Sequence, residues 1–162
     1  MDVQQYLEIL REIKDVAFAT IGEDGKPQVR IIDVMIVRDE RLYFVTARGK
    51  EFHREIDENP HVAITGMTKE YLAVRLNGVV KKADPGWLDE VFDMNLAMND
   101  VYPGDSRNIL DVFYIEDGYG EVFDLGKHPI HRQSFVLGKG KLKPKGFEIS
   151  AHCIGCGACK EH

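Results

Sequence analysis

Residues 16–47 read VAFATIGEDGKPQVRIIDVMIVRDERLYFVTA, and this stretch gives the strongest indication of the fold. Two apolar runs rich in β-branched residues, 16–21 and 28–37, flank a turn that contains glycine and proline. The charged run 38–41 then separates them from a third apolar run, residues 42–47. Parallel neighbours need long crossover connections, so three strands joined by short polar turns predict an antiparallel meander.

Helices are expected on both sides of this meander. An apolar stripe with helical spacing predicts a first amphipathic helix; it consists of Val3, Tyr6, Leu7, Leu10 and Ile13. Residues 49–58 have helical composition and end at Asn59-Pro60. Asp84 and Pro85 suit the N-cap and the first position of another helix, which we expect to end near Asn99.

Further strands complete the predicted sheet. They are expected over residues 61–66, 71–82, 112–116, 119–125, 134–137 and 147–150. Asp117-Gly118 is a pair favoured in type I′ turns, so it predicts a hairpin between residues 112–116 and 119–125. Six or more short strands with two or three helices predict a mainly β or α+β fold built around a small β-barrel.

Composition and charge predict one globular domain followed by a basic tail. The chain has 162 residues, of which 44% are hydrophobic and 30% charged, as in folded globular proteins. Its net charge is −6, yet residues 127–145 carry six lysines or arginines and no acid. We therefore divide the chain into a domain over residues 1–126 and a basic linker with a cysteine-rich tail over residues 127–162. An acidic domain would repel phosphate, so we expect no nucleic-acid partner.

The same features predict a cytoplasmic protein. No apolar run approaches the roughly 20 residues that a membrane helix needs, and the first residues do not resemble a signal peptide. The three cysteines all lie within residues 153–159, too close together for a disulfide framework. Such spacing favours metal ligation in a reducing compartment.

A candidate anion site lies where the third strand runs into the next helix. Thr46 ends that strand, and Arg48-Gly49-Lys50 opens the helix, while Arg30 lies on the preceding strand. A helix N-terminus offers unpaired N–H groups and a partial positive charge, and glycine lets the backbone approach a ligand. The pattern is typical of a site for a phosphorylated cofactor.

Three segments in this order resemble the pyridoxamine 5′-phosphate oxidase-like flavoprotein family: PQVRIIDV at 27–34, LYFVTARGK at 42–50 and NPHVAITG at 59–66. The resemblance covers roughly residues 3–125. It implies a split antiparallel β-barrel with a few flanking helices, which binds FMN at the interface of a homodimer.

The resemblance also assigns residues to the cofactor. They are Arg30, Ile31, Ile32, Val45, Thr46, Arg48, Gly49, Lys50 and Arg75. Among them Lys50 is implied to hold the phosphate, and Arg75 and Asn77 lie on a strand that often faces the flavin. A cross-strand ion pair is the alternative role for Arg75.

The implied function is that of an FMN-binding oxidoreductase acting on a small molecule, such as a nitro compound. The true oxidase binds its vitamin substrate through a C-terminal pattern of tryptophan and arginine. That pattern is absent here, because the only tryptophan is Trp87. We expect Trp87 to be a core or interface residue. The alternative is a non-catalytic electron carrier or metal-binding module, since no dedicated acid, base or substrate-binding motif is evident.

The cysteine tail indicates a metal site. Cys153, Cys156 and Cys159 have the C-x₂-C-x₂-C spacing of a bacterial ferredoxin, and His162 stands one position before its fourth cysteine would. The fourth ligand of an iron–sulfur cluster would be His162, His152 or an exogenous group. The alternatives are zinc, bound by the three cysteines and His162, or no metal.

Overall fold

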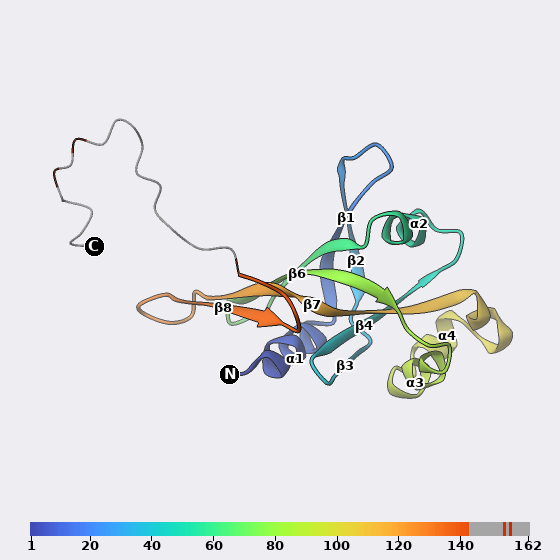
Figure 1. Cartoon of the computed structure of the whole chain (residues 1–162). Coiled ribbons are helices and arrows are strands. Elements are labelled where there is room, and N and C mark those ends of the chain that lie inside the picture. The colour runs from blue at the N-terminus through green and yellow to red at the C-terminus, as the bar shows by residue number, and fades with distance from the viewer. Residues whose placement is uncertain (143–153, 155, 157–162) are drawn as a thin grey trace.

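The computed structural model describes residues 1–142, 154 and 156 and shows a curved antiparallel sheet with helices around it (Figure 1). The helices are α1 (Val3–Ile13), α2 (Glu51–Glu58), α3 (Trp87–Met94), α4 (Met98–Val101) and the 3₁₀ helix η1 (Gly104–Ile109). The strands are β1 (Asp15–Ile21), β2 (Pro27–Asp33), β3 (Ile36–Arg38), β4 (Arg41–Ala47), β5 (His61–Met67), β6 (Leu72–Lys82), β7 (Leu110–Asp124) and β8 (His131–Leu137).

The strands form one sheet in the order β2-β1-β5-β6-β7-β4-β3, with β8 paired to β7. Every pair is antiparallel. The prediction of a mainly β, split-barrel fold with flanking helices is therefore confirmed. The strand β8 also places residues 131–137 in the sheet, so the sheet continues beyond residue 126, where the composition changes.

The prediction of a simple meander is wrong, because the run 28–37 is interrupted at Val34 and Met35. The N–H of Val34 donates to the carbonyl of Lys14, and that of Met35 to the carbonyl of Tyr43, both at 2.9 Å. Both side chains are buried although they are consecutive, which breaks the alternation of a single strand. The chain therefore leaves β2 at one end of the sheet order and enters β3 at the other.

The predicted hairpin at Asp117-Gly118 is also wrong, because β7 is one strand of 15 residues. Gly118 lies opposite Gly78 of β6, and the register shifts between Val79 and Val80. A Cβ atom on Gly118 would lie 2.1 Å from the carbonyl oxygen of Asn77. This glycine therefore allows the close approach of two strands and does not form a turn.

The predicted helix over residues 84–99 is divided in two. Asp84 accepts a hydrogen bond from the N–H of Trp87 through its backbone carbonyl, so Asp84 forms a turn and α3 begins only at Trp87. Asn95 follows the end of α3, and its amide donates to the carbonyls of Val91 and Met35. The remaining helix predictions are confirmed: α1 buries Tyr6, Leu7 and Leu10, and α2 ends at Glu58.

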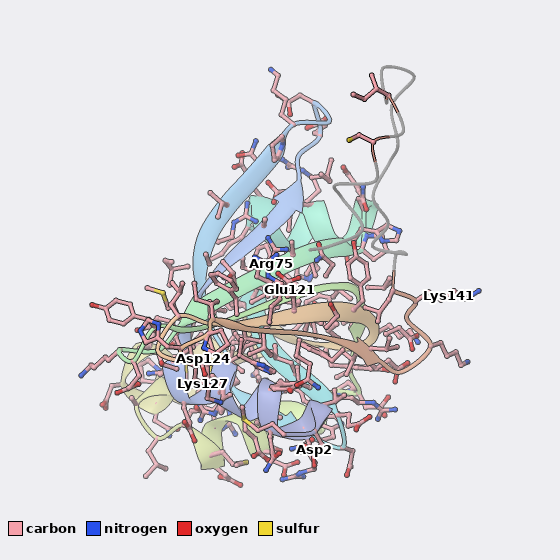
Figure 2. The ribbon with its side chains drawn as sticks, turned by 90° about the vertical axis from the view of Figure 1, so that its left-hand side faces the viewer. Asp2, Arg75, Glu121, Asp124, Lys127 and Lys141 are labelled. Carbon is pink, nitrogen blue, oxygen red and sulfur yellow. The ribbon has the colours of Figure 1, made fainter. Side chains whose placement is uncertain are left out.

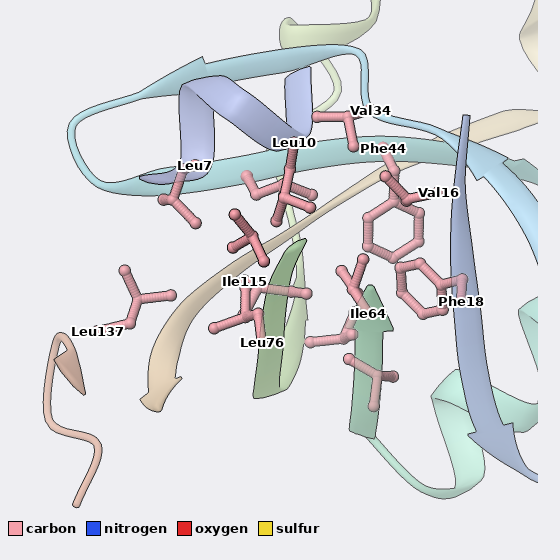
Figure 3. Close-up of a cluster of buried hydrophobic side chains, with 14 of the residues drawn as sticks. Leu7, Leu10, Val16, Phe18, Val34, Phe44, Ile64, Leu76, Ile115 and Leu137 are labelled. Atoms are coloured by element: carbon pink, nitrogen blue, oxygen red, sulfur yellow. The ribbon is translucent and has the colours of Figure 1, made fainter. Parts of the chain in front are cut away.

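Two apolar clusters lie on the two faces of β4. The larger one fills the inside of the curved sheet, where Phe18, Phe44 and Ile64 are fully or almost fully buried and α1 contributes Leu7 and Leu10 (Figure 3). Each such side chain contributes roughly 1.5–3 kcal/mol when buried.

The smaller cluster lies between β4, β7 and α3. Trp87 stacks there on Tyr43 with ring centroids 4.2 Å apart, so Trp87 packs against the core as expected.

Candidate functional site

The loop between β4 and α2 consists of Arg48, Gly49 and Lys50. Gly49 has φ +90°, which strains any residue with a side chain, and the space beside it is open. Lys50 is the N-cap residue of α2 and is exposed. In the described part of the chain, no carboxylate forms an ion pair with its ammonium group. The loop therefore presents an uncompensated positive charge at the start of a helix.

Arg48 is held by Asp111, which lies at the start of β7. One guanidinium nitrogen of Arg48 is 2.9 Å from Asp111 Oδ1, and another donates to the carbonyl of Asn108. Asp111 Oδ2 accepts hydrogen bonds from His53 Nε2 and Lys82 Nζ, each at 2.8 Å. One carboxylate thus positions an arginine, a lysine and a histidine that come from three different parts of the chain.

Burial alone would raise the pKa of Asp111, whose side chain is only 10% exposed. The hydrogen bonds from Lys82 and His53, together with the charges of Lys82 and Arg48, outweigh this effect and lower the pKa below its ordinary value. Asp111 is therefore ionised in the folded protein at neutral pH.

Arg30 lies on the other side of α2 and is bound within a second polar network. Its guanidinium donates to the hydroxyl of Thr20 at 2.6 Å and to Glu55 at 2.7 Å, and it lies 4.7 Å above the ring of Phe52. Thr20 also donates to Glu55. Glu55 is a buried residue of α2, so the network fixes Arg30 against this helix.

The structure divides the predicted cofactor residues between two places. Thr46, Arg48, Gly49 and Lys50 lie together along the end of β4 and the loop to α2, and Arg30 packs against the same helix.

Ile31 and Arg75 lie elsewhere. Ile31 is 63% exposed on β2, and Arg75 pairs across strands with Glu121 at 3.7 Å, so Arg75 does form the ion pair that was its alternative role (Figure 2). Of the others, Ile32 packs against the large cluster and Val45 against the small one.

Ile31 belongs to an open face of the sheet that turns away from the core. The rows Val29-Ala19-Ala63-Asn77 and Ile31-Ala17-Thr65-Arg75 cross β2, β1, β5 and β6 on this face. A cavity of 330 Å³ lies along both rows, and a larger one of 620 Å³ extends from Ala19 and Ala63 to Gly118 and Lys139. We call these two rows the outer face.

Sequence reasoning missed Glu55 and Asp111. The signal for Glu55 is its position with Phe52 and Ile56 on the buried stripe of α2, where a charged side chain needs a partner. The signal for Asp111 is weaker, because it only precedes an apolar run, and its partners become close only through folding.

The predicted metal ligands lie almost entirely outside the described residues. Cys153, Cys159 and His162 are outside them, and Cys156 is a free, exposed thiol. Within residues 1–142, 154 and 156 no group of three or more His, Cys, Asp or Glu side chains is arranged to hold a metal ion. No helix in the same residues is long and apolar enough to cross a membrane.

Residues 3–109 match the family described as pyridoxamine 5′-phosphate oxidase, over strands β1 to β6 and the loop that carries Lys50. The chain belongs to this family. The match confirms the resemblance seen in the three sequence segments.

Individual relatives support the assignment. Dihydrophenazinedicarboxylate synthase of Pseudomonas chlororaphis is 33% identical over 85 residues, which are 49% of this chain but only 38% of the relative. A NimC/NimA family protein of Clostridium acetobutylicum has a TM-score of 0.70 at 25% identity, covering 83% of this chain and 92% of that one.

A pyridoxamine 5′-phosphate oxidase-related, FMN-binding protein of Nostoc punctiforme shares the fold. Its TM-score is 0.55 at 12% identity, with 83% of this chain and 92% of that chain covered.

Asp111→Asn should lower the free energy of unfolding by about 1–3 kcal/mol at pH 7, because a neutral amide cannot balance the charges of Arg48 and Lys82. The folded-state pKa of Asp111 lies below the unfolded value near 3.9, so the carboxylate stabilises the fold at higher pH. The difference between native protein and variant should therefore shrink as the pH falls below about 4. Urea unfolding of both proteins at several pH values measures this difference in the free energy of unfolding.

Asp89→Asn is the matched control, because Asp89 also pairs with an arginine but is 76% exposed. Its effect should stay below about 1 kcal/mol. An Asp111→Asn effect equally small, or unchanged at pH 3, would contradict the assigned role of Asp111.

Proposed function

We propose that the protein is an FMN-dependent oxidoreductase acting on a small molecule, and that the β4–α2 loop binds the FMN phosphate. The observation that carries this proposal is Lys50, an exposed cation at the start of α2 with no carboxylate partner among the described residues, beside the open space at Gly49. Membership of the pyridoxamine 5′-phosphate oxidase family supports a phosphorylated flavin as the anion.

The donors in the loop fit a phosphate. A guanidinium has five N–H donors, and Arg48 directs one to Asp111 and one to Asn108, which leaves others available. The ammonium of Lys50 and the N–H groups of the first turn of α2 add further donors. Because Arg48 and Arg30 each pair with a buried carboxylate, Lys50, which has no such partner among the described residues, should contribute most of the net attraction.

The role of the protein is to bind and orient the cofactor. Bound FMN supplies hydride or electron transfer. Thr46, buried at the end of β4, Arg48 and Lys50 hold the phosphate end, and the rigid networks of Asp111 and Glu55 keep the surrounding cations in place.

Lys50→Ala should weaken FMN binding by about 10- to 100-fold, because a charge-assisted hydrogen bond to phosphate contributes about 1.5–3 kcal/mol. Riboflavin lacks the phosphate, so its binding should not change. Quenching of flavin fluorescence measures both affinities. Lys127→Ala, which removes a lysine at the far end of β7, should bind FMN normally.

Two outcomes would contradict the proposal. If Lys50→Ala and the native protein bind FMN equally, the loop is not the phosphate site. If the FMN-loaded, reduced protein is reoxidised by nitroaromatic compounds and other small acceptors no faster than by a generic electron acceptor, the protein is an electron carrier and not an oxidoreductase.

We also propose that the outer face forms a homodimer interface. Val29 and Ile31 are 70% and 63% exposed there, and the alanines between β1 and β5 allow another surface to approach closely. Exposed apolar patches of this kind mark interfaces between proteins. The cavities on this face would then be closed by the second copy.

Val29→Lys should shift the protein from dimer to monomer, because it buries an unpaired charge in the interface. Light scattering coupled to size exclusion measures the molar mass. Leu96→Lys is the control: Leu96 is 74% exposed but lies between α3 and α4, so the dimer should persist. A native protein that is monomeric at micromolar concentration would refute the interface.

For the tail we propose that Cys153, Cys156 and Cys159, with His162, bind an iron–sulfur cluster, or zinc as the alternative. The free, exposed thiol of Cys156 is available for ligation. Metal analysis of the full chain purified without air should find iron and sulfide, or zinc, and Cys156→Ser should lose it. Lys50→Ala should retain the metal. Native protein without either metal would contradict this proposal.

A further inference from the structure

A separate cavity of 340 Å³ lies between the end of β6, the start of α3, η1 and the start of β7. It does not touch the outer face. Arg48 is the one residue of the β4–α2 loop that also lines it. The FMN proposal does not use the other residues of this cavity.

The charged side chains of this cavity leave an excess of positive charge. Arg48, Lys82 and Arg107 line it together with two carboxylates, Asp89 and Asp111. Both oxygens of Asp111 are occupied by Arg48, Lys82 and His53. Asp89 is 76% exposed and pairs with Arg107 at 3.1 Å. One positive charge therefore remains unbalanced among these groups.

The cationic groups are also held in place while keeping unused donors. Arg48 and Lys82 are fixed by the same carboxylate, and Arg107 lies 5.1 Å above the ring of Phe92. A guanidinium has five N–H donors and an ammonium three, more than these contacts use. Fixed donors lose little entropy when a ligand arrives.

Another part of the lining is apolar. Pro85 and Leu88 come from the start of α3, and Leu110 and Val112 from β7, where both are nearly fully buried. Cationic donors next to an apolar surface suit a ligand with an anionic group and an apolar body. Bare phosphate would leave the apolar surface unused.

We propose that this cavity binds a small organic carboxylate, with its carboxylate on Lys82 and Arg107 and its apolar body against Pro85 and Leu88. The volume is at the lower end of the roughly 300–1,000 Å³ found for ligand sites, which fits a single ring or a short chain. The proposal goes beyond the FMN-dependent function and does not require it.

Benzoate is the probe. It should bind the native protein saturably, and the uncharged benzamide should bind at least tenfold more weakly. Isothermal titration measures binding, and the fluorescence of Trp87, the only tryptophan and the chain neighbour of Leu88, reports it locally. Arg107→Gln and Lys82→Gln should each weaken benzoate binding about tenfold, with the fold checked by circular dichroism. Because two variants are tested, one can still decide the question if the other does not fold.

Arg132→Gln is the matched control, since Arg132 also pairs with a glutamate and lies 4.7 Å above an aromatic ring, that of Phe123, outside the cavity. It should bind benzoate like the native protein. The proposal is overturned if benzoate does not saturate, if benzamide binds equally well, or if Arg132→Gln weakens binding as much as Arg107→Gln. Displacement of benzoate by FMN or by inorganic phosphate would also overturn it, by assigning the cavity to the cofactor site.

Discussion

The two backbone hydrogen bonds at Val34 and Met35 are the constraint on which the rest of the structure depends. They end β2 beside β1 and start β3 beside β4, so that consecutive segments lie at opposite ends of the sheet order. This connection curls the sheet around the large apolar cluster. It also sets β4 against β7, which brings Asp111 next to Arg48. The polar site thus depends on a turn more than ten residues away from it.

The charges around α2 follow a simple division. Two buried or nearly buried carboxylates, Glu55 and Asp111, each take one arginine of the predicted site, Arg30 and Arg48. Buried carboxylates without such partners would cost several kcal/mol. Lys50 lies on the surface, where water solvates it, and needs no internal partner. The internal ion pairs therefore fix the shape of the site, while the surface lysine supplies its net charge.

The sequence was informative where a local pattern has one structural meaning. The stripe of α1, the end of α2 and the loop Arg48-Gly49-Lys50 could be placed because spacing and residue type determine them locally. It misled where one residue type serves two purposes. Asp117-Gly118 has the sequence pattern of a turn, but Gly118 lies within β7, where the missing side chain lets β6 approach closely. The run 28–37 has the pattern of a single strand, because the two tertiary hydrogen bonds that interrupt it leave no local signal in the sequence.

In the candidate site, too, the sequence predicts what a local pattern determines and not what tertiary contacts bring together. The residues of the β4–α2 loop were identified from the sequence, whereas their carboxylate partners were not, since Arg48 and Asp111 are far apart along the chain. The cavity beside them brings together β6, α3, η1 and β7, and no sequence pattern relates these segments.

The length of β7 has a consequence for how the chain folds. β7 pairs with β4, β6 and β8. Leu42 of β4, for example, lies opposite Ile115 of β7, which is far along the chain. Pairing β4 with β7 closes the long segment of chain between them, which is entropically costly. Folds dominated by contacts between residues far apart in the sequence form slowly. During synthesis β4 must therefore wait, with an unpaired edge, until residues 110–124 have emerged. The N-terminal half of the barrel is then open to pairing with other chains, and the speed with which β7 joins it determines how much of the protein escapes aggregation.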